Sequence, residues 1–302
     1  MQSNPSPARR PTFGSFWHGP PLSAYEQACI SSFVKRGYEF VVYAYDVSMS
    51  TPPGVELRDA REVTPLADVD LFIYDGRPNL SHFSDYFRYR MFDATDHVWV
   101  DTDILLIDTF PEPVPATLLT KETEDSLCGA VMRLDPSELP LDQLISRTRD
   151  MAGRSLHWGE TGPQLLTTVF ADSDLRERAA APDLYYPVLY DVFWKVFLPE
   201  EYDACDELCA NAATLHLWNN IVVQLGIWKD LAPPRGSYLH HLLELDNSLH
   251  LFRETYPEDV MRRMVENWRL RFSGADVGGG NLLRQLGPSA LRTARRRGWL
   301  RP

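Results

Sequence analysis

The sequence predicts an α/β fold, in which strands and helices alternate along the first hundred residues. Apolar segments of strand length lie at 13–18, 38–45 and 97–101, and they are rich in aromatic and β-branched side chains. Two segments of helical character, 23–37 and 81–93, separate them. This alternation is typical of a sheet with a parallel portion, because two parallel strands need a long crossover between them.

The first of these helices has recognisable signals at both ends. The Gly-Pro-Pro at 19–21 ends the preceding strand. Ser23 is expected as the N-cap, and Glu26, three residues later, completes a capping box with it. The helix is then expected to run to Gly37.

The pattern becomes less regular beyond residue 104, and the remaining elements are predicted from shorter signals. We expect a weak extended segment at 70–74, a proline-rich extended loop at 111–115, helices at 143–152 and 164–170, and short extended segments at 185–190 and 213–218.

The chain divides into three parts by composition. Residues 1–12 are rich in Pro, Ser and Arg and are expected to form a disordered lead-in, and 13–272 form the α/β domain. Residues 273–302 form a basic C-terminal extension, which is interpreted either as a solvated helix end or as a peripheral contact with an anionic membrane. No apolar segment has the length of a signal peptide or a membrane span, so the protein is expected in the cytoplasm, with the inner membrane face as its peripheral site.

Charge and cysteine content narrow the function classes. The formal net charge of −12 argues against a nucleic-acid partner, which requires a basic surface. An acidic protein that binds a phosphate-bearing substrate must neutralise it locally, and a bound cation is the usual solution. The four cysteines are scattered and are interpreted as reduced thiols.

The strand at 97–101 leads into an Asp-x-Asp motif, Asp101-Thr102-Asp103. In an extended chain the side chains of Asp101 and Asp103 point to the same side and can converge on one ion. Ligands of open α/β sheets bind beyond the carboxyl ends of the strands, where this pair lies. Its carboxylates suit Mg²⁺ or Mn²⁺, although a solvated pair at a strand end is the simpler interpretation of the motif alone.

The helix before this strand carries a second group of polar residues. Asp85, Arg88 and Tyr89 share one helix face at spacings of three and four residues. A fixed carboxylate and guanidinium offer the acceptors and donors that sugar hydroxyls need. The alternative is an ordinary ion pair on the helix surface.

In this order, the motifs resemble the Asp-x-Asp sugar-binding glycosyltransferases. That family includes initiating Golgi mannosyltransferases, α-1,4-galactosyltransferases and bacterial polysaccharide glycosyltransferases. The resemblance covers about residues 13–260 and rests on the segments 16–19, 42–46, 53–55, 58–60, 83–89, 99–103, 161–163 and 216–218. The chain departs from the family at Asp96 and His97, where relatives have two glycines, and at 127–132, where relatives are rich in Asn.

The resemblance implies a GT-A fold, that is, a Rossmann-like sheet that binds a nucleotide-diphosphate sugar. Mn²⁺ or Mg²⁺ would be held by Asp101 and Asp103, with His216 as a further ligand that favours Mn²⁺. The alternative for His216 is a packed core histidine. Asp101, Asp103 and Asp85 are the implied catalytic residues.

The same resemblance implies a donor site for a UDP- or GDP-linked sugar and a glycan or lipid-linked acceptor. Transfer would retain the anomeric configuration. The implied donor-binding residues are Trp17, His18, Asp85, Arg88, Tyr89, Thr102, Gly162 and Asn219. Packing at a strand end is an alternative for Trp17, and an ordinary loop position for His18.

Two other functions compete with this hypothesis. Haloacid-dehalogenase-like phosphohydrolases also place an Asp-x-Asp after an apolar strand, and here Asp101 would be the nucleophile. They normally carry the motif near the chain start, and they need a later Lys and Asp pair. The second competitor is a noncatalytic sugar-binding protein that has kept the fold.

Overall fold

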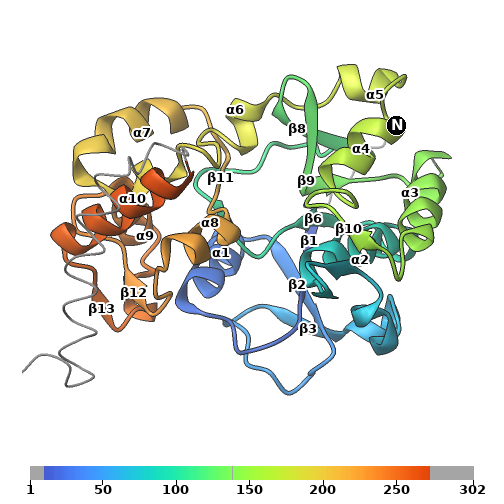
Figure 1. Cartoon of the computed structure of the whole chain (residues 1–302), viewed down its shortest axis with the longest axis horizontal. Helices are drawn as coiled ribbons and strands as arrows, with labels where there is room; N and C mark the ends of the chain where they lie inside the picture. The colour runs from blue at the N-terminus through green and yellow to red at the C-terminus, as the bar shows by residue number, and fades with distance from the viewer. Residues whose placement is uncertain (1–9, 138, 273–302) are drawn as a thin grey trace, which may run out of the picture.

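The computed structural model describes residues 10–137 and 139–272, and its centre is a six-stranded mixed sheet in the order β3-β2-β1-β6-β9-β8 (Figure 1). The strands β1, β2, β3 and β6 run parallel, and β9 pairs antiparallel with both β6 and β8. Their bounds are β1 Thr12–Trp17, β2 Glu39–Ala44, β3 Glu56–Asp59, β6 Val98–Val100, β8 Leu118–Thr123 and β9 Ser126–Arg133. The fold is therefore mixed α/β and compatible with the Rossmann-like sheet expected from the sequence.

Helices cover both faces of this sheet, because its central strands are apolar on both sides. In β2, Val42 faces the helix α1 (Ala24–Lys35), while its neighbours Val41 and Tyr43 face α2 (Leu80–Ala94). The face of α2 is completed by α3 (Leu139–Asp150) and α4 (Pro163–Val169).

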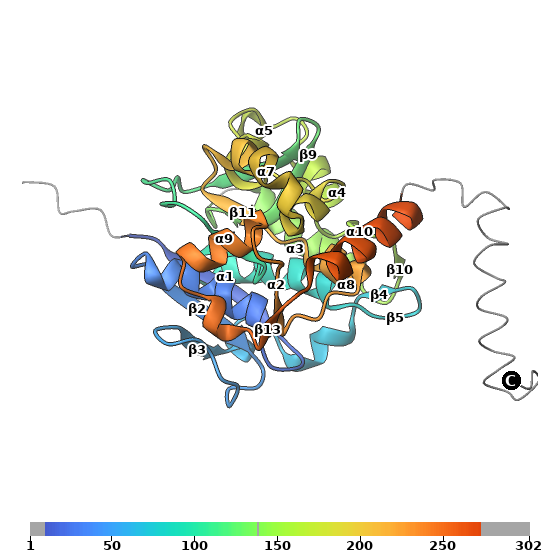
Figure 2. The same cartoon turned by 90° about the vertical axis from the view of Figure 1, so that its left-hand side faces the viewer.

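Residues 188–272 form a helical layer beside the sheet, which faces the viewer in Figure 2. It buries its own apolar cluster, to which the strands β7 (Ile104–Leu106) and β11 (Thr214–His216) contribute Leu105 and Leu215. These two strands pair antiparallel and join the layer to the sheet. The helices of the layer are α7 Tyr202–Cys209, α8 Asn219–Leu225, α9 Tyr238–Leu245 and α10 Glu258–Phe272.

Small elements complete the fold. They are the sheet of β4 (Ile73–Tyr74), β5 (Arg77–Pro78) and β10 (Ser155–Leu156), the pair β12 (Leu231–Ala232) and β13 (Glu254–Thr255), the short helices α5 (Asp174–Glu177) and α6 (Pro182–Tyr185), and the 3₁₀ turns 60–62, 66–70, 193–197, 199–201 and 249–251.

The predicted strands at 13–18, 38–45 and 97–101 are confirmed as β1, β2 and β6, and the segment at 213–218 contains β11. All four predicted helices are present, within a few residues of the expected bounds. The capping box is also confirmed, since the Glu26 carboxylate accepts a hydrogen bond from the Ser23 N–H at 2.9 Å.

Other predictions need correction. The segment 185–190 is not a strand, because Tyr185 ends α6. Tyr186 is buried, and its hydroxyl forms hydrogen bonds with the Thr120 hydroxyl and the Val131 N–H. Thr12, expected at the end of the lead-in, instead pairs with Glu39 in the sheet, and residues 1–9 lie outside the described residues. The basic extension, with Arg292, Arg295, Arg296, Arg297 and Arg301, lies outside the described residues. Within the described ranges, no helix combines the length and apolar character needed to cross a membrane.

Candidate metal centre

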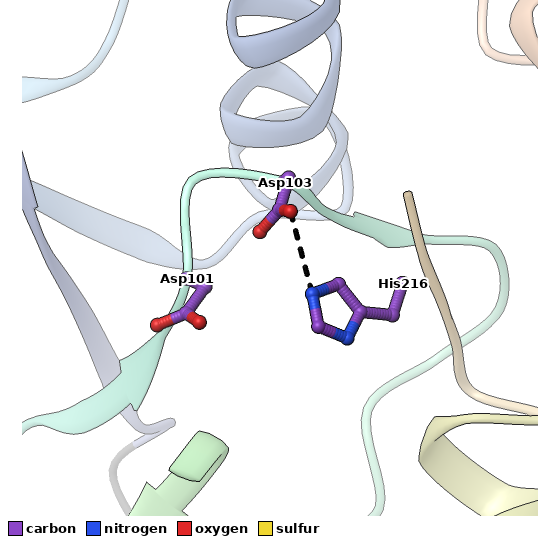
Figure 3. Close-up of side chains that lie close together, drawn as sticks. All are labelled: Asp101, Asp103 and His216. Carbon is purple, nitrogen blue, oxygen red and sulfur yellow. Dashed lines mark ion pairs between the residues drawn. The ribbon is translucent and has the colours of Figure 1, made fainter. Parts of the chain in front are cut away.

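Two aspartates and one histidine meet where β6 ends. Asp101 and Asp103 lie in the turn between β6 and β7, and His216 is the last residue of β11. Each side chain offers one ligand atom, and these atoms lie within 4.8 Å of one another. Figure 3 shows the three side chains around one space, with the imidazole directed at Asp103. The convergence predicted from the sequence is therefore present.

The reason for this convergence differs from the predicted one. The chain is not extended through the motif, because the Ile104 N–H donates to the Asp101 carbonyl at 3.0 Å and closes a turn. The strand pairing then sets His216 opposite Ile104. The Leu217 N–H donates to the Asp103 carbonyl at 2.8 Å and ties the turn to β11.

Asp103 and His216 form an ion pair. His216 Nε2 lies 3.3 Å from Asp103 Oδ2, and the Asn219 N–H donates to the same oxygen at 2.7 Å. Burial alone would raise the pKa of Asp103, but His216 and the Asn219 N–H lower it to about 2. Burial alone would lower the pKa of His216, yet the neighbouring Asp103 charge raises it. A cation bound here would take the place of the imidazolium proton.

Asp101 is held through one of its two oxygens. Its Oδ1 accepts hydrogen bonds from Arg88 Nη2 at 2.7 Å and from Trp99 Nε1 at 2.6 Å. No side chain or backbone group of the described residues donates to Oδ2. The carboxylate is thus fixed in orientation while one oxygen stays open to a cation.

The Asp85–Arg88 pair is buried, so the surface-ion-pair interpretation is wrong. Arg88 is 4% exposed, and its guanidinium bridges Asp85 at 3.0 Å and Asp101 at 2.7 Å. The same guanidinium lies over the Trp99 ring, 4.9 Å from its centroid. Burial raises the pKa of Asp85 to about 6, against the opposing effects of Arg88 and of a hydrogen bond from Thr161.

Two glycines make room for this pair. A Cβ at Gly129 in β9 would stand 1.9 Å from Arg88 Nη1, and one at Gly162 would stand 2.8 Å from Asp85 Oδ2. Gly162 was singled out from the sequence, but Gly129 was missed. It lies in the segment where the resembled family is rich in Asn, and a lone glycine in an apolar strand carries little signal.

The other residues singled out from the sequence surround the centre at different depths. Trp17 and His18 lie half-buried at the end of β1, where the Trp17 indole donates to the Pro20 carbonyl at 2.7 Å. Thr102 lies in the turn between the two aspartates. Tyr89 is fully buried, and its hydroxyl donates to the Thr161 carbonyl at 2.9 Å, which ties α2 to the loop before α4.

Two polar atoms beside the centre are buried without a hydrogen-bond partner among the described residues. They are His216 Nδ1 and Asn219 Oδ1. Such an atom costs about 1–3 kcal/mol, so it is uncommon away from functional sites. Between them, Trp218 stacks on the imidazole at 3.9 Å, although its backbone takes the left-handed conformation with φ of 44°. Strain and unpaired polar atoms concentrated at one place indicate a ligand site.

Glu122 is a further acidic group that sequence reasoning missed. It lies half-buried in β8, and burial raises its pKa while the charge of His216 lowers it. Glu122 lies in the charged stretch 121–125, which has the composition of an ordinary solvent-exposed hairpin, so the sequence gives no indication that it lies near the site.

Neither protein-family models nor curated proteins give a match to this chain. The function is therefore inferred from the residues of the site.

Proposed function

We propose that the protein is a metal-dependent glycosyltransferase with a GT-A fold. It moves a hexosyl group, with retention of configuration, from a UDP- or GDP-linked sugar to a hydroxyl of a glycan or lipid-linked acceptor. The observation that carries the proposal is the Asp101, Asp103 and His216 group beyond the ends of parallel strands, joined by Arg88 to the buried Asp85. A phosphate-bearing donor and a −12 charge require a cation there.

The donor set suits a divalent ion. Two carboxylate oxygens and one imidazole nitrogen fit Mn²⁺ better than Mg²⁺, since Mg²⁺ prefers oxygen ligands alone. The ion would neutralise the diphosphate as the sugar departs. Asp103 would hold it together with His216, and Asp101 would add the oxygen that Arg88 and Trp99 leave open.

Arg88 and Asp85 offer fixed polar groups next to this ion. Arg88 Nε is buried without a partner among the described residues, so the guanidinium keeps a donor for a ligand. Burial raises the pKa of Asp85 to about 6, so the carboxylate is mainly ionised at pH 7 and gains a proton just below neutral pH. Both groups would orient the donor sugar.

The competing functions fit less well. A phosphohydrolase would use the open Oδ2 of Asp101 as its nucleophile, but the ion pair with Arg88 makes that carboxylate a weaker nucleophile. A noncatalytic sugar-binding protein would keep Asp85 and Arg88 but has no need of the Asp103–His216 pair.

The test is release of nucleoside diphosphate from a panel of UDP- and GDP-sugars by the full chain with Mn²⁺. We expect Asp103→Asn to lower turnover by orders of magnitude, because the departing diphosphate is then poorly neutralised. Asp172→Asn is the matched control, since Asp172 is an exposed aspartate in the loop between α4 and α5, and we expect wild-type turnover from it.

Three outcomes would contradict the proposal. Undiminished turnover in a folded Asp103→Asn variant would remove the metal centre from the reaction. Hydrolysis of p-nitrophenyl phosphate by wild type, lost in Asp101→Asn, would indicate the phosphohydrolase. Binding of a nucleotide sugar without turnover of any donor would indicate the noncatalytic protein.

A further inference from the structure

A second polar feature lies at the other end of the Asp85 network. His82 in α2 is only 2% exposed, and two aromatic rings lie beside it. Tyr74 in β4 is 5.8 Å from the imidazole between ring centroids, and Trp158, just after β10, is 6.2 Å away. Trp158 is 49% exposed. The strands β4, β5 and β10 lie together at one side of the molecule in Figure 2.

Hydrogen bonds fix which nitrogen of His82 carries the proton. Thr161 Oγ1 donates its single proton to Asp85 Oδ2 at 2.8 Å, so its 2.7 Å contact with His82 must be accepted from Nδ1–H. Burial lowers the pKa of His82, which keeps the ring neutral near pH 7. A neutral imidazole with its proton on Nδ1 leaves Nε2 as an acceptor.

That acceptor has no partner. Nε2 of His82 is buried, and no described residue donates to it. The protein thus maintains an unpaired acceptor at the end of a chain of hydrogen bonds, which is unfavourable unless a ligand completes it.

Hydrogen bonds fix the main chain around Trp158, the exposed residue beside His82. Gln164 Nε2 donates to the Trp158 carbonyl at 3.0 Å, and the Glu160 carboxylate accepts from the His157 N–H at 2.9 Å. Arg154 pairs with Glu160 at 3.0 Å. These contacts fix the main chain around Trp158 and leave its ring half-exposed at the surface.

We propose that Tyr74, His82 and Trp158 form a carbohydrate subsite, in which His82 Nε2 accepts a sugar hydroxyl and the Trp158 ring covers the apolar face of the sugar. Aromatic walls with one well-placed polar atom are typical of small-molecule sites, and a sugar offers both an apolar face and hydroxyl donors. Because Nε2 is buried in this structure, the proposal requires the half-exposed Trp158 ring to turn outward before the sugar binds and to close on it afterwards.

The role of this subsite as the acceptor site rests on the proposed glycosyltransferase function. The hydrogen-bonded chain from His82 runs through Thr161, Asp85 and Arg88 to Asp101 and so connects this subsite with the metal centre.

The test measures binding of methyl glycosides of glucose, galactose, mannose and N-acetylglucosamine to the full chain by saturation-transfer NMR. EDTA is present and nucleotide is absent, so the result is independent of turnover. We expect saturable binding of at least one glycoside, weakened about tenfold or more in Trp158→Ala. Trp228→Ala removes another exposed tryptophan, in the loop between α8 and β12, and should leave binding unchanged.

Two His82 variants separate ligand binding from folding. Asn places an N–H near the position of Nδ1 and can keep the bond to Thr161, but it has no atom at the place of Nε2. His82→Asn should therefore lose binding about tenfold while keeping its melting temperature. His82→Gln keeps an acceptor near Nε2 and should bind more tightly than His82→Asn.

The proposal is overturned if no glycoside binds the wild type saturably, or if Trp158→Ala binds as the wild type does. Binding of uridine in place of the glycosides, lost in Trp158→Ala, would overturn it too, because it would assign the surface to a nucleoside. These outcomes leave the metal centre untouched. Conversely, Asp103→Asn should abolish turnover yet retain glycoside binding, so the two proposals fail separately.

Discussion

At the scale of single residues, the ion pair of Asp103 and His216 makes both stability and metal binding depend on pH. The pKa of Asp103 is lowered to about 2 and that of His216 is raised, each by the charge of the other after burial has acted in the opposite direction. The stability from Asp103 is present above its unfolded pKa near 4 and is lost as the pH falls towards 2. The stability from His216 is present below its unfolded pKa near 6.5 and is lost as the pH rises through its raised value.

A bound cation would give His216 the opposite pH dependence, because metal affinity increases with pH whereas the stability from the ion pair decreases. Because a ligand nitrogen must be deprotonated, we expect Mn²⁺ to bind more tightly as the pH rises through the raised pKa of His216. Calorimetry in two buffers of different ionisation enthalpy should detect proton release on Mn²⁺ binding at pH 6. His216→Asn should release none, whereas His250→Asn, which alters an exposed histidine, should behave as the wild type. Equal proton release by His216→Asn would show that His216 is not a ligand.

At the scale of elements, the contact between β9 and α2 decides where the charged network of Arg88 lies. The guanidinium of Arg88 extends from α2 against β9, where Gly129 leaves the space that it occupies. Three partners then hold it, namely Asp85, Asp101 and the Trp99 ring. The orientation of the candidate metal ligand Asp101 thus depends on Gly129, which lies in another strand and far from it in sequence.

Gly129→Ala should therefore destabilise the protein and disturb the centre together. Its Cβ would stand 1.9 Å from Arg88 Nη1, and the guanidinium can move only by giving up buried partners. We expect a loss of about 1–3 kcal/mol in the free energy of unfolding, measured in urea, and weaker Mn²⁺ binding. Gly14→Ala in β1 is the control, because its Cβ would meet the adaptable Met91 sulfur at 2.9 Å. A larger loss in Gly14→Ala than in Gly129→Ala would contradict this account.

At the scale of the whole molecule, the C-terminal helical layer holds His216 in position. The cluster that buries Leu215 and Leu217 also contains Met261, Val265 and Trp268 of α10. The layer therefore holds β11 against β7, and with it the third residue of the metal centre.

Trp268→Ala should show how much this layer contributes. The indole is 2% exposed, stacks on Phe272 and donates to Gln224 of α8 at 3.3 Å. We expect a loss of about 3–5 kcal/mol in the free energy of unfolding, as for other buried tryptophans. Trp228→Ala, at a residue 73% exposed, should change it by less than about 0.5 kcal/mol. Similar values for the two variants would mean that α10 contributes little to the core.

Local sequence patterns predicted a good part of the fold. The strands β1, β2 and β6 and the helices α1 and α2 follow from apolar periodicity and capping residues that lie within each element. The strands β3 and β8 were missed because their polar and charged residues mask the period of two. The strand β9 was missed because it is buried on both faces and so shows no alternation, and Gly129 interrupts its apolar run. The helices α7 to α10 were missed because much of their stability comes from packing on one another.

The sequence by itself determined the α/β class, the Asp-x-Asp motif at the end of a buried strand, and the spacing of Asp85 and Arg88 on one helix. Only the tertiary structure decided that Arg88 is buried between two carboxylates, and that His216 meets Asp103 rather than the core alone. It also revealed the unpaired acceptor of His82 and the glycine that admits Arg88. Periodicity reports which face of an element is apolar, because that depends on neighbours in the chain. Burial, pKa and ligand geometry depend on groups that the fold brings together from distant segments, and no local pattern encodes them.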